Sequence, residues 1–198
     1  KLNYDISLYH MSVTDLLVAR RVGDDQFVGV NAGQTSHNGL EAMLDCQLLD
    51  GPNRVSVFTS YTLSDHSFID FVDGDNDYSG NALTGTAPHH INGGIDMKTQ
   101  VGLYGNINYK YLSSFPMRDD NSIYSESYQV INLKLGYQKL INNSLKLNLY
   151  FGMGNVLDEK YASMILINAS SFGSRAPRYY YPGLPRNIFY GTEIKLYF

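Results

Sequence analysis

The sequence has a single cysteine, no tryptophan, few charged residues and no long apolar run. Cys46 alone excludes an internal disulfide framework and a metal cluster built from cysteines. No stretch of about 18 consecutive apolar residues occurs, which excludes a transmembrane helix. A net charge of −4 without a basic stripe argues against nucleic-acid binding. The first residues already alternate in polarity and do not resemble a signal peptide, so we expect a mature chain or a fragment.

The residues that are abundant favour strands and turns over helices. Charged residues make up 17% of the chain, whereas about a quarter is usual for a soluble globular protein. Aromatic residues reach 13% and are mostly tyrosine, and the 18 glycines and 6 prolines suit a chain with many turns. This composition therefore predicts strand periodicity along the chain.

Apolar and polar residues alternate with a period of two in eight segments. The seventh segment is the clearest, with Leu145, Leu147, Leu149, Phe151 and Met153 on one side. The segments are residues 2–9, 39–48, 55–63, 91–98, 101–111, 131–138, 145–154 and 188–198. Helical spacing is not sustained over any comparable stretch, so the sequence predicts an all-β fold.

The lengths of the connections predict which kind of β-protein this is. The connections at residues 50–53, 99–100 and 141–143 are short, whereas those at 11–35, 64–88, 113–127 and 157–185 are long and polar. Short turns therefore lie at one end of the strands and long loops at the other. That asymmetry is typical of bacterial outer-membrane barrels, so we expect an antiparallel transmembrane β-barrel.

The charged residues of the segments fall on one face. They are Glu41, Asp45, Asp96, Lys98, Lys110, Lys134, Lys146, Glu193 and Lys195. A lysine facing the bilayer midplane costs roughly 2–4 kcal/mol, so these residues are expected to face a lumen. Tyr109, Tyr111 and Tyr137 near the ends of the apolar face fit an interfacial aromatic girdle. A soluble calyx with the two faces inverted has the same periodicity and is the alternative.

Several motifs occur in an order and spacing that resemble a known family. Residues 155–161 read Asn-Val-Leu-Asp-Glu-Lys-Tyr, residues 182–187 read Pro-Gly-Leu-Pro-Arg-Asn, and the chain ends on Phe198. Residues 36–41 and 86–90 resemble two earlier strand starts of the same family. The set resembles the closing strands of TonB-dependent outer-membrane transporters, although Leu157 replaces the more usual phenylalanine.

The resemblance implies that residues 1–198 are the last eight strands of a barrel of about 22 strands. The plug domain and the segment that binds the TonB energy-coupling complex are then absent from this chain. The implied function is TonB-dependent uptake across the Gram-negative outer membrane, in most cases of a ferric siderophore, with haem, cobalamin and oligosaccharide left open. The alternative is a complete eight-stranded barrel with a structural or adhesive role.

The resemblance also implies partners. They are the TonB complex, the barrel-assembly machinery, a small-molecule substrate and outer-membrane lipid, with no nucleic acid and no cofactor. Phe198 is the expected assembly signal, because the machinery of this family reads the terminal strand.

Arg175, Arg178, Tyr179, Tyr180 and Tyr181 form the candidate ligand-binding cluster of the last long loop. Arginines match carboxylates and anionic chelates, and tyrosine rings supply rigid contact area. The alternative is that the tyrosines only anchor the last strand at the membrane interface.

Other candidate sites are weaker. His89 and His90 are adjacent and point to opposite faces of a strand, so they do not share a metal ion. One long loop contains four aspartates, which fit a solvated acidic loop better than a calcium site; they are Asp70, Asp73, Asp75 and Asp77. No nucleophile motif surrounds any serine, so we do not expect the protein to be an enzyme. From the histidine and aspartate patterns we also expect no metal site.

Overall fold

The computed structural model describes residues 1–15, 17–23, 26–31, 33–142, 144–171 and 176–197. All regular secondary structure in these ranges consists of β-strands, which confirms the prediction of an all-β fold. No helix among the described residues is long and apolar enough to cross a membrane.

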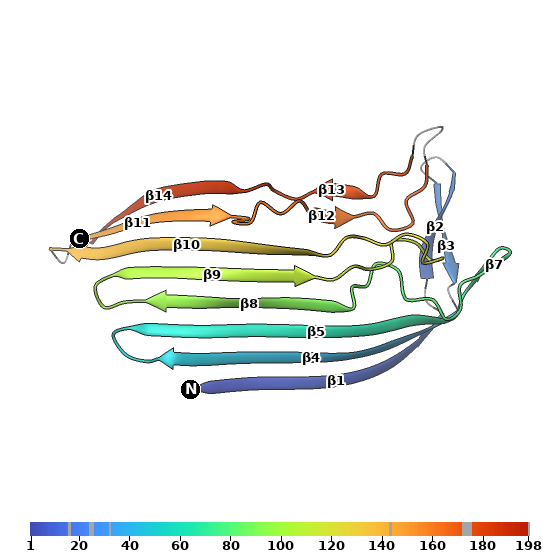
Figure 1. The fold of residues 1–198 in the computed structure, drawn as a ribbon, viewed down its shortest axis with the longest axis horizontal. Helices are drawn as coiled ribbons and strands as arrows, with labels where there is room; N and C mark the ends of the chain where they lie inside the picture. Colours follow the sequence, from blue (N-terminus) through green and yellow to red (C-terminus); the bar gives the residue numbers. More distant parts are fainter. Residues whose placement is uncertain (16, 24–25, 32, 143, 172–175, 198) are drawn as a thin grey trace.

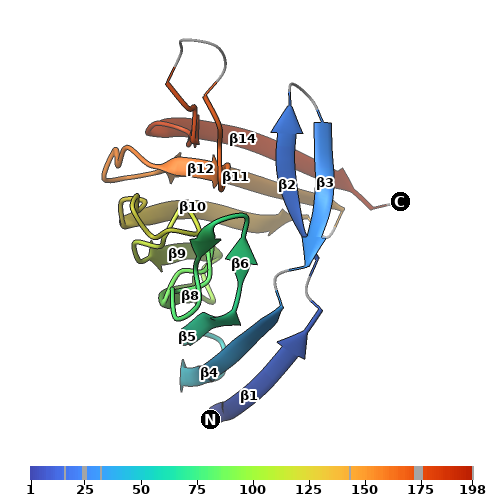
Figure 2. The ribbon, with the colours of Figure 1, turned by 90° about the vertical axis from the view of Figure 1, so that its right-hand side faces the viewer.

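Eight strands form one antiparallel sheet in the order in which they occur along the chain (Figure 1). They are β1 (Leu2–Thr14), β4 (Gln34–Leu49), β5 (Arg54–Asp70), β8 (His89–Lys98), β9 (Leu103–Leu112), β10 (Tyr128–Ile141), β11 (Leu145–Gly154) and β14 (Asn187–Leu196). Within the described residues β1 and β14 are the two edges and do not pair. The sheet is an open arc (Figure 2), which disfavours the alternative of a closed eight-stranded barrel.

Three tight turns lie at the same end of the sheet as both chain termini (Figure 1). In the turn between β8 and β9, Gly102 has φ 99°, and a Cβ there would lie 2.0 Å from the carbonyl oxygen of Gln138. Only glycine fits this close approach. In the turn after β10, Asn142 adopts φ 50°, a conformation that asparagine tolerates better than most residues.

The long loops at the opposite end carry short hairpins that the sequence pattern did not predict. They are formed by β2 (Leu17–Gly23) with β3 (Gln26–Asn31), β6 (Val72–Asp73) with β7 (Asn76–Asp77), and β12 (Ala162–Ile165) with β13 (Tyr180–Pro182). The predicted bounds of β1, β4 and β5 were also too short at this end. The ladders continue to Thr14, Gln34 and Asp70 because strands that project beyond a bilayer pair through their backbones without needing an apolar face.

The register of the sheet confirms the predicted division into two faces. Lys134 lies opposite Asn106 and Gly152, whereas Leu149 lies opposite Tyr137 and Thr192. Because directly opposed residues share a face, all the predicted polar-face charges lie on one side. In the eight strands as described, the charged residues on the apolar side are Asp65 and Asp70 toward its loop end and Lys139 toward its turn end.

Aromatic rings lie over glycines of the neighbouring strand on the polar face. The opposed pairs are Tyr9–Gly39, Phe58–Gly94, Tyr104–Gly136, Tyr150–Gly191 and Phe189–Gly152. A Cβ on any of these glycines would lie 2.1–2.6 Å from the opposed side chain. The ring therefore occupies the space of the missing side chain, an arrangement that offsets the weakness of glycine within a strand.

Buried apolar side chains lie at the loop end and not beneath the sheet. Phe68, Phe71, Phe115, Met117, Val130 and Tyr179 are the buried hydrophobic residues among those described. Midway along β11, Leu149 and Phe151 remain 42% and 40% exposed. No described segment covers the apolar face, and this face matches the hydrocarbon layer of a membrane.

Candidate ligand-binding loops

Segments from three long loops pack around a small apolar cluster above the sheet. Phe115 and Met117 come from the β9–β10 loop, and Tyr179 comes from the β11–β14 loop. Ile165 and Ala87 pack against them from the β11–β14 loop and the β5–β8 loop. Burial of these side chains holds the loops together at the end of the barrel wall that has no tight turns.

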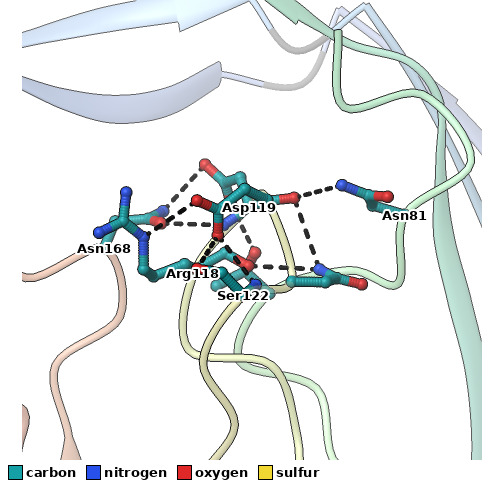
Figure 3. Close-up of polar contacts among 8 residues, drawn as sticks. Asn81, Arg118, Asp119, Ser122 and Asn168 are labelled. Carbon is teal, nitrogen blue, oxygen red and sulfur yellow. Dashed lines mark hydrogen bonds and ion pairs between the residues drawn. The ribbon is translucent and has the colours of Figure 1, made fainter. Parts of the chain in front are cut away.

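A network of hydrogen bonds joins the same three loops and is centred on Asp119 (Figure 3). The Asn81 side chain donates to the backbone oxygen of Asp119 over 2.7 Å, and the Thr84 hydroxyl donates to its carboxylate. Asn168 donates to that carboxylate over 3.0 Å and accepts from the Asp119 backbone N–H over 3.1 Å. We call Asn81, Thr84, Asp119, Asn121 and Asn168 the Asp119 junction.

Asn121 completes the junction from a left-handed backbone conformation. Its φ of 53° turns the side chain toward Ala82, with which it exchanges two hydrogen bonds of 2.9 and 3.0 Å. The Asn121 amide thus bonds to both the N–H and the carbonyl oxygen of one residue, as a residue of a neighbouring strand would. The β9–β10 loop is thereby fixed to the β5–β8 loop.

The junction lies in an acidic environment. Partial burial raises the pKa of Asp120, but hydrogen bonds from Ser122 and the nearby Arg118 guanidinium outweigh it, so that pKa is lowered overall. Burial raises the pKa of Tyr78, and the carboxylates of Asp73, Asp120 and Asp119 raise it further. Nε of Arg118 lies 3.4 Å from Oδ2 of Asp120, and both side chains are exposed. This part of the β9–β10 loop therefore presents charges of both signs to solvent.

The structure separates the residues of the predicted ligand-binding cluster. Tyr179 is 9% exposed and belongs to the apolar cluster, whereas Arg178, Tyr180 and Tyr181 are exposed. The hydroxyl of Tyr179 has no hydrogen-bond partner among the described residues. Arg175 lies outside the residues that the structure describes, as does Phe198. Tyr179 precedes β13 and packs against Phe115 and Met117, whereas Tyr180 and Tyr181 within β13 have no such cover among the described residues.

The 155–161 motif holds the two ends of the last long loop together. The buried Asn155 side chain donates to the backbone oxygens of Glu159 and Leu184 and accepts from the Glu159 N–H, over 2.9–3.0 Å. Asp158 accepts a hydrogen bond of 2.9 Å from the backbone N–H of Arg186. The Tyr161 ring lies over Gly183, whose N–H donates to the backbone carbonyl oxygen of Tyr161 over 2.7 Å. We call these contacts the Asn155 clasp.

No sequence pattern predicted the Asp119 junction. Its members are ordinary loop asparagines and aspartates, and the available signal was only the Asp-Asp-Asn-Ser run at residues 119–122, which is typical of a turn. Among the described residues, no group of three or more histidine, cysteine, aspartate or glutamate side chains could hold a metal ion.

Comparison with known proteins identifies the barrel wall. The chain matches a family described as "TonB dependent receptor-like, beta-barrel" over residues 1–156. The whole chain superimposes on the ferric yersiniabactin uptake receptor FyuA of Yersinia pestis, with a TM-score of 0.72 and 15% identity. Over 99% of its length, the chain also superimposes on the ferric-catecholate import receptor Fiu of E. coli K12, with a TM-score of 0.68 and 18% identity.

These solved receptors are longer than the chain. The chain spans 28% of FyuA and 25% of Fiu, and it spans 29% of the ferric citrate transporter FecA, with a TM-score of 0.68 and 19% identity. Identities this low show a shared fold, whereas the family match covers most of the chain. The family is one of TonB-dependent receptors, and these neighbours are uptake and import receptors and a transporter rather than enzymes. The chain therefore belongs to the TonB-dependent receptors, as a part of their β-barrel.

Proposed function

We propose that residues 1–198 form the C-terminal wall and loops of a receptor that imports a scarce nutrient across the outer membrane, with a ferric siderophore as the favoured substrate. The observation that carries this proposal is the open eight-stranded sheet, with an apolar face exposed along its length and charges on the other face. Such a wall suits a barrel with a large lumen, because it separates lipid on its apolar face from water on its charged face. The likeness to siderophore and ferric citrate receptors supports the choice of substrate class.

In this proposal the barrel wall works with parts that lie outside the chain. The loops capture the ligand on the cell surface, and a plug domain coupled to the TonB complex opens a path through the lumen. The eight strands cross the membrane repeatedly and contact lipid with their apolar face. Arg178, Tyr180 and Tyr181 contact the ligand, because they are exposed beside the loops that the Asp119 junction holds together. Contacts by Arg175 and by the buried Tyr179 stay predictions.

The test is uptake of radioactive iron by cells that express the full-length receptor as their only route for a panel of ferric siderophores. We expect uptake of at least one chelate with TonB, and none in a strain that lacks TonB. Arg178→Ala is expected to weaken binding of an anionic chelate, while the exposed Lys160→Ala in the same loop serves as the matched loss of a cation. Absence of TonB-dependent uptake for every ferric siderophore in the panel would contradict the favoured substrate class.

Deleting Phe198 tests the proposed assembly signal. The barrel-assembly machinery is expected to pair with the terminal strand as an added β-strand. We therefore expect less folded receptor in the outer membrane, measured by heat-modifiable gel mobility, with unchanged ligand affinity per folded molecule. Normal folding with lost ligand binding would contradict this division of roles.

A further inference from the structure

Two histidines face each other across neighbouring strands at the loop end of the polar face. His37 of β4 is the direct register partner of His66 of β5. Their ring centroids are 4.6 Å apart, with 63° between the ring planes. The pair lies beyond Leu63, where β8 ends its pairing with β5, and both side chains are partly buried. Neither residue belongs to the Asp119 junction or to the predicted ligand-binding cluster.

One nitrogen of each ring is held by a hydroxyl group. The Nε2 atom of His37 lies 2.9 Å from the Thr35 hydroxyl, and the Nε2 atom of His66 lies 3.1 Å from the Tyr9 hydroxyl. Neither Nδ1 atom has a hydrogen-bond partner among the described residues. Metal-binding histidines usually donate the N–H of one ring nitrogen to an oxygen and bind the metal through the other. Thr35 and Tyr9 supply such oxygens.

The spacing of the rings also fits a shared metal ion. With metal–nitrogen bonds of about 2.0–2.1 Å, two imidazoles bound side by side to one ion have centroids roughly 4.5–5.2 Å apart. The observed separation of 4.6 Å lies in this range. The two rings pack against each other across the β4–β5 register pair, so they lie at that distance without a metal ion.

We propose that His37 and His66 form a two-imidazole site for a divalent transition-metal ion, with Nδ1 of each ring as the ligand atom. Imidazole suits copper and zinc, and the general order of affinities places Cu²⁺ above Zn²⁺. The described residues provide no third protein ligand, so water or donor atoms of a bound chelate fill the remaining positions. The site is independent of the proposed transport function.

The test is titration of metal-free, full-length receptor in detergent with Cu²⁺ and with Zn²⁺, followed by calorimetry. We expect one site that binds Cu²⁺ more tightly, and a loss of affinity of about tenfold or more in His37→Ala and in His66→Ala. His10→Ala and His89→Ala are the matched controls, because both histidines lie on the opposite face of the sheet, and they should leave the affinity unchanged. Unchanged Cu²⁺ affinity in both folded pair variants would overturn the proposal.

Electron paramagnetic resonance of the Cu²⁺-loaded receptor provides the second measurement. We expect couplings to the nitrogens of two imidazoles in the wild type and of one in His37→Gln or His66→Gln, which keep a polar side chain. Tyr9→Phe keeps both ligands and removes only the hydroxyl group, so it should weaken binding about tenfold without removing either coupling. A wild-type spectrum with a single imidazole would contradict the two-histidine site.

Discussion

A single asparagine determines how the chain enters its last strand. Asn155 is 2% exposed and has φ 50°, so both its backbone and its side chain are tightly constrained. Its amide bonds to the start of the last loop at Glu159 and to the end of that loop at Leu184. The family motif at residues 155–161 therefore has a structural reason: it fixes the point at which β14 joins the sheet.

Replacing Asn155 by alanine should destabilise the receptor. The change leaves the polar groups of Glu159 and Leu184 without their partner, and we expect a loss of roughly 2–4 kcal/mol. Heat-modifiable gel mobility over a temperature series measures the effect. Alanine at this position is also strained by the positive φ. Asn155→Gly separates this backbone strain from the lost hydrogen bonds, because glycine relieves the strain but does not restore the bonds. The exposed Asn76→Ala is the control, and an Asn155→Ala variant as stable as that control would refute the clasp.

Asp120 should make the loops sensitive to acid. Its folded-state pKa lies below the usual value of 3.8 for an aspartate, so its stabilising contribution is present above about pH 4 and is lost as the pH falls through the lowered pKa. We expect the midpoint temperature of loop unfolding to decrease as the pH is lowered through this range. Asp120→Asn should flatten that part of the plot of midpoint temperature against pH. Differential scanning fluorimetry at pH values from about 2 to about 6 measures it. An identical acid limb in the variant would contradict the assignment.

At the scale of elements, the loops form one unit because contacts between residues far apart in the sequence join them. The Asp119 junction connects residues that are 38, 35 and 49 positions apart in the sequence, and the cluster of Phe115, Met117 and Tyr179 packs within the same set of loops. Loops joined in this way present a preorganised surface, which lowers the ordering cost of binding a ligand.

Asp119→Ala should loosen the loops without unfolding the wall. It removes the acceptor for Thr84 and Asn168, whereas the ladders of the sheet do not involve this side chain. Faster hydrogen exchange is expected at residues 81–87 and 165–171, with unchanged exchange in β10 and β11. Asp75→Ala serves as the control, because Asp75 is an exposed carboxylate in the same group of loops. Equal exchange in the two variants would show that the junction does not hold the loops.

At the scale of the whole molecule, two charges mark the limits of the apolar face. Lys139 lies on this face opposite Leu147, close to the tight turn between β10 and β11. Asp65 lies on the same face at the loop end, beyond the segment of β5 that pairs with β8. Lysine near a membrane interface extends its ammonium group toward water. Leu147 therefore sits near the interface, and Leu149 lies nearer the middle of the bilayer.

Depth predicts different costs for the same substitution. Leu149→Lys should reduce barrel stability by roughly 2–4 kcal/mol, whereas Leu147→Lys beside Lys139 should cost about 0–1 kcal/mol. Urea titration of receptor folded in lipid vesicles measures both values. Asn148→Lys, on the polar face between them, controls for the added charge. Equal costs for Leu147 and Leu149, or a larger cost at Asn148, would contradict the assignment of the faces.

The strand count, the two faces and the separation of tight turns from long loops were determined by the sequence alone. Alternation is a local property, and a bilayer makes it strict: a charge in the middle of the lipid-facing side is costly, so apolar residues such as Leu149, Phe151 and Met153 recur there without interruption. The family motifs were also readable, because the Asn155 clasp is built from residues close to each other in two short segments.

Only the tertiary structure decided how far the strands extend, which loop residues meet and which edges stay open. Beyond the apolar band, β5 continues through His66 to Asp70 because backbone pairing with β4 holds it, and no periodicity marks that pairing. The burial of Tyr179, the contacts of Asp119 and the meeting of His37 with His66 depend on the register and on packing between loops. Long-range contacts of this kind leave no trace in the local pattern, since each partner taken alone is an ordinary polar or aromatic residue.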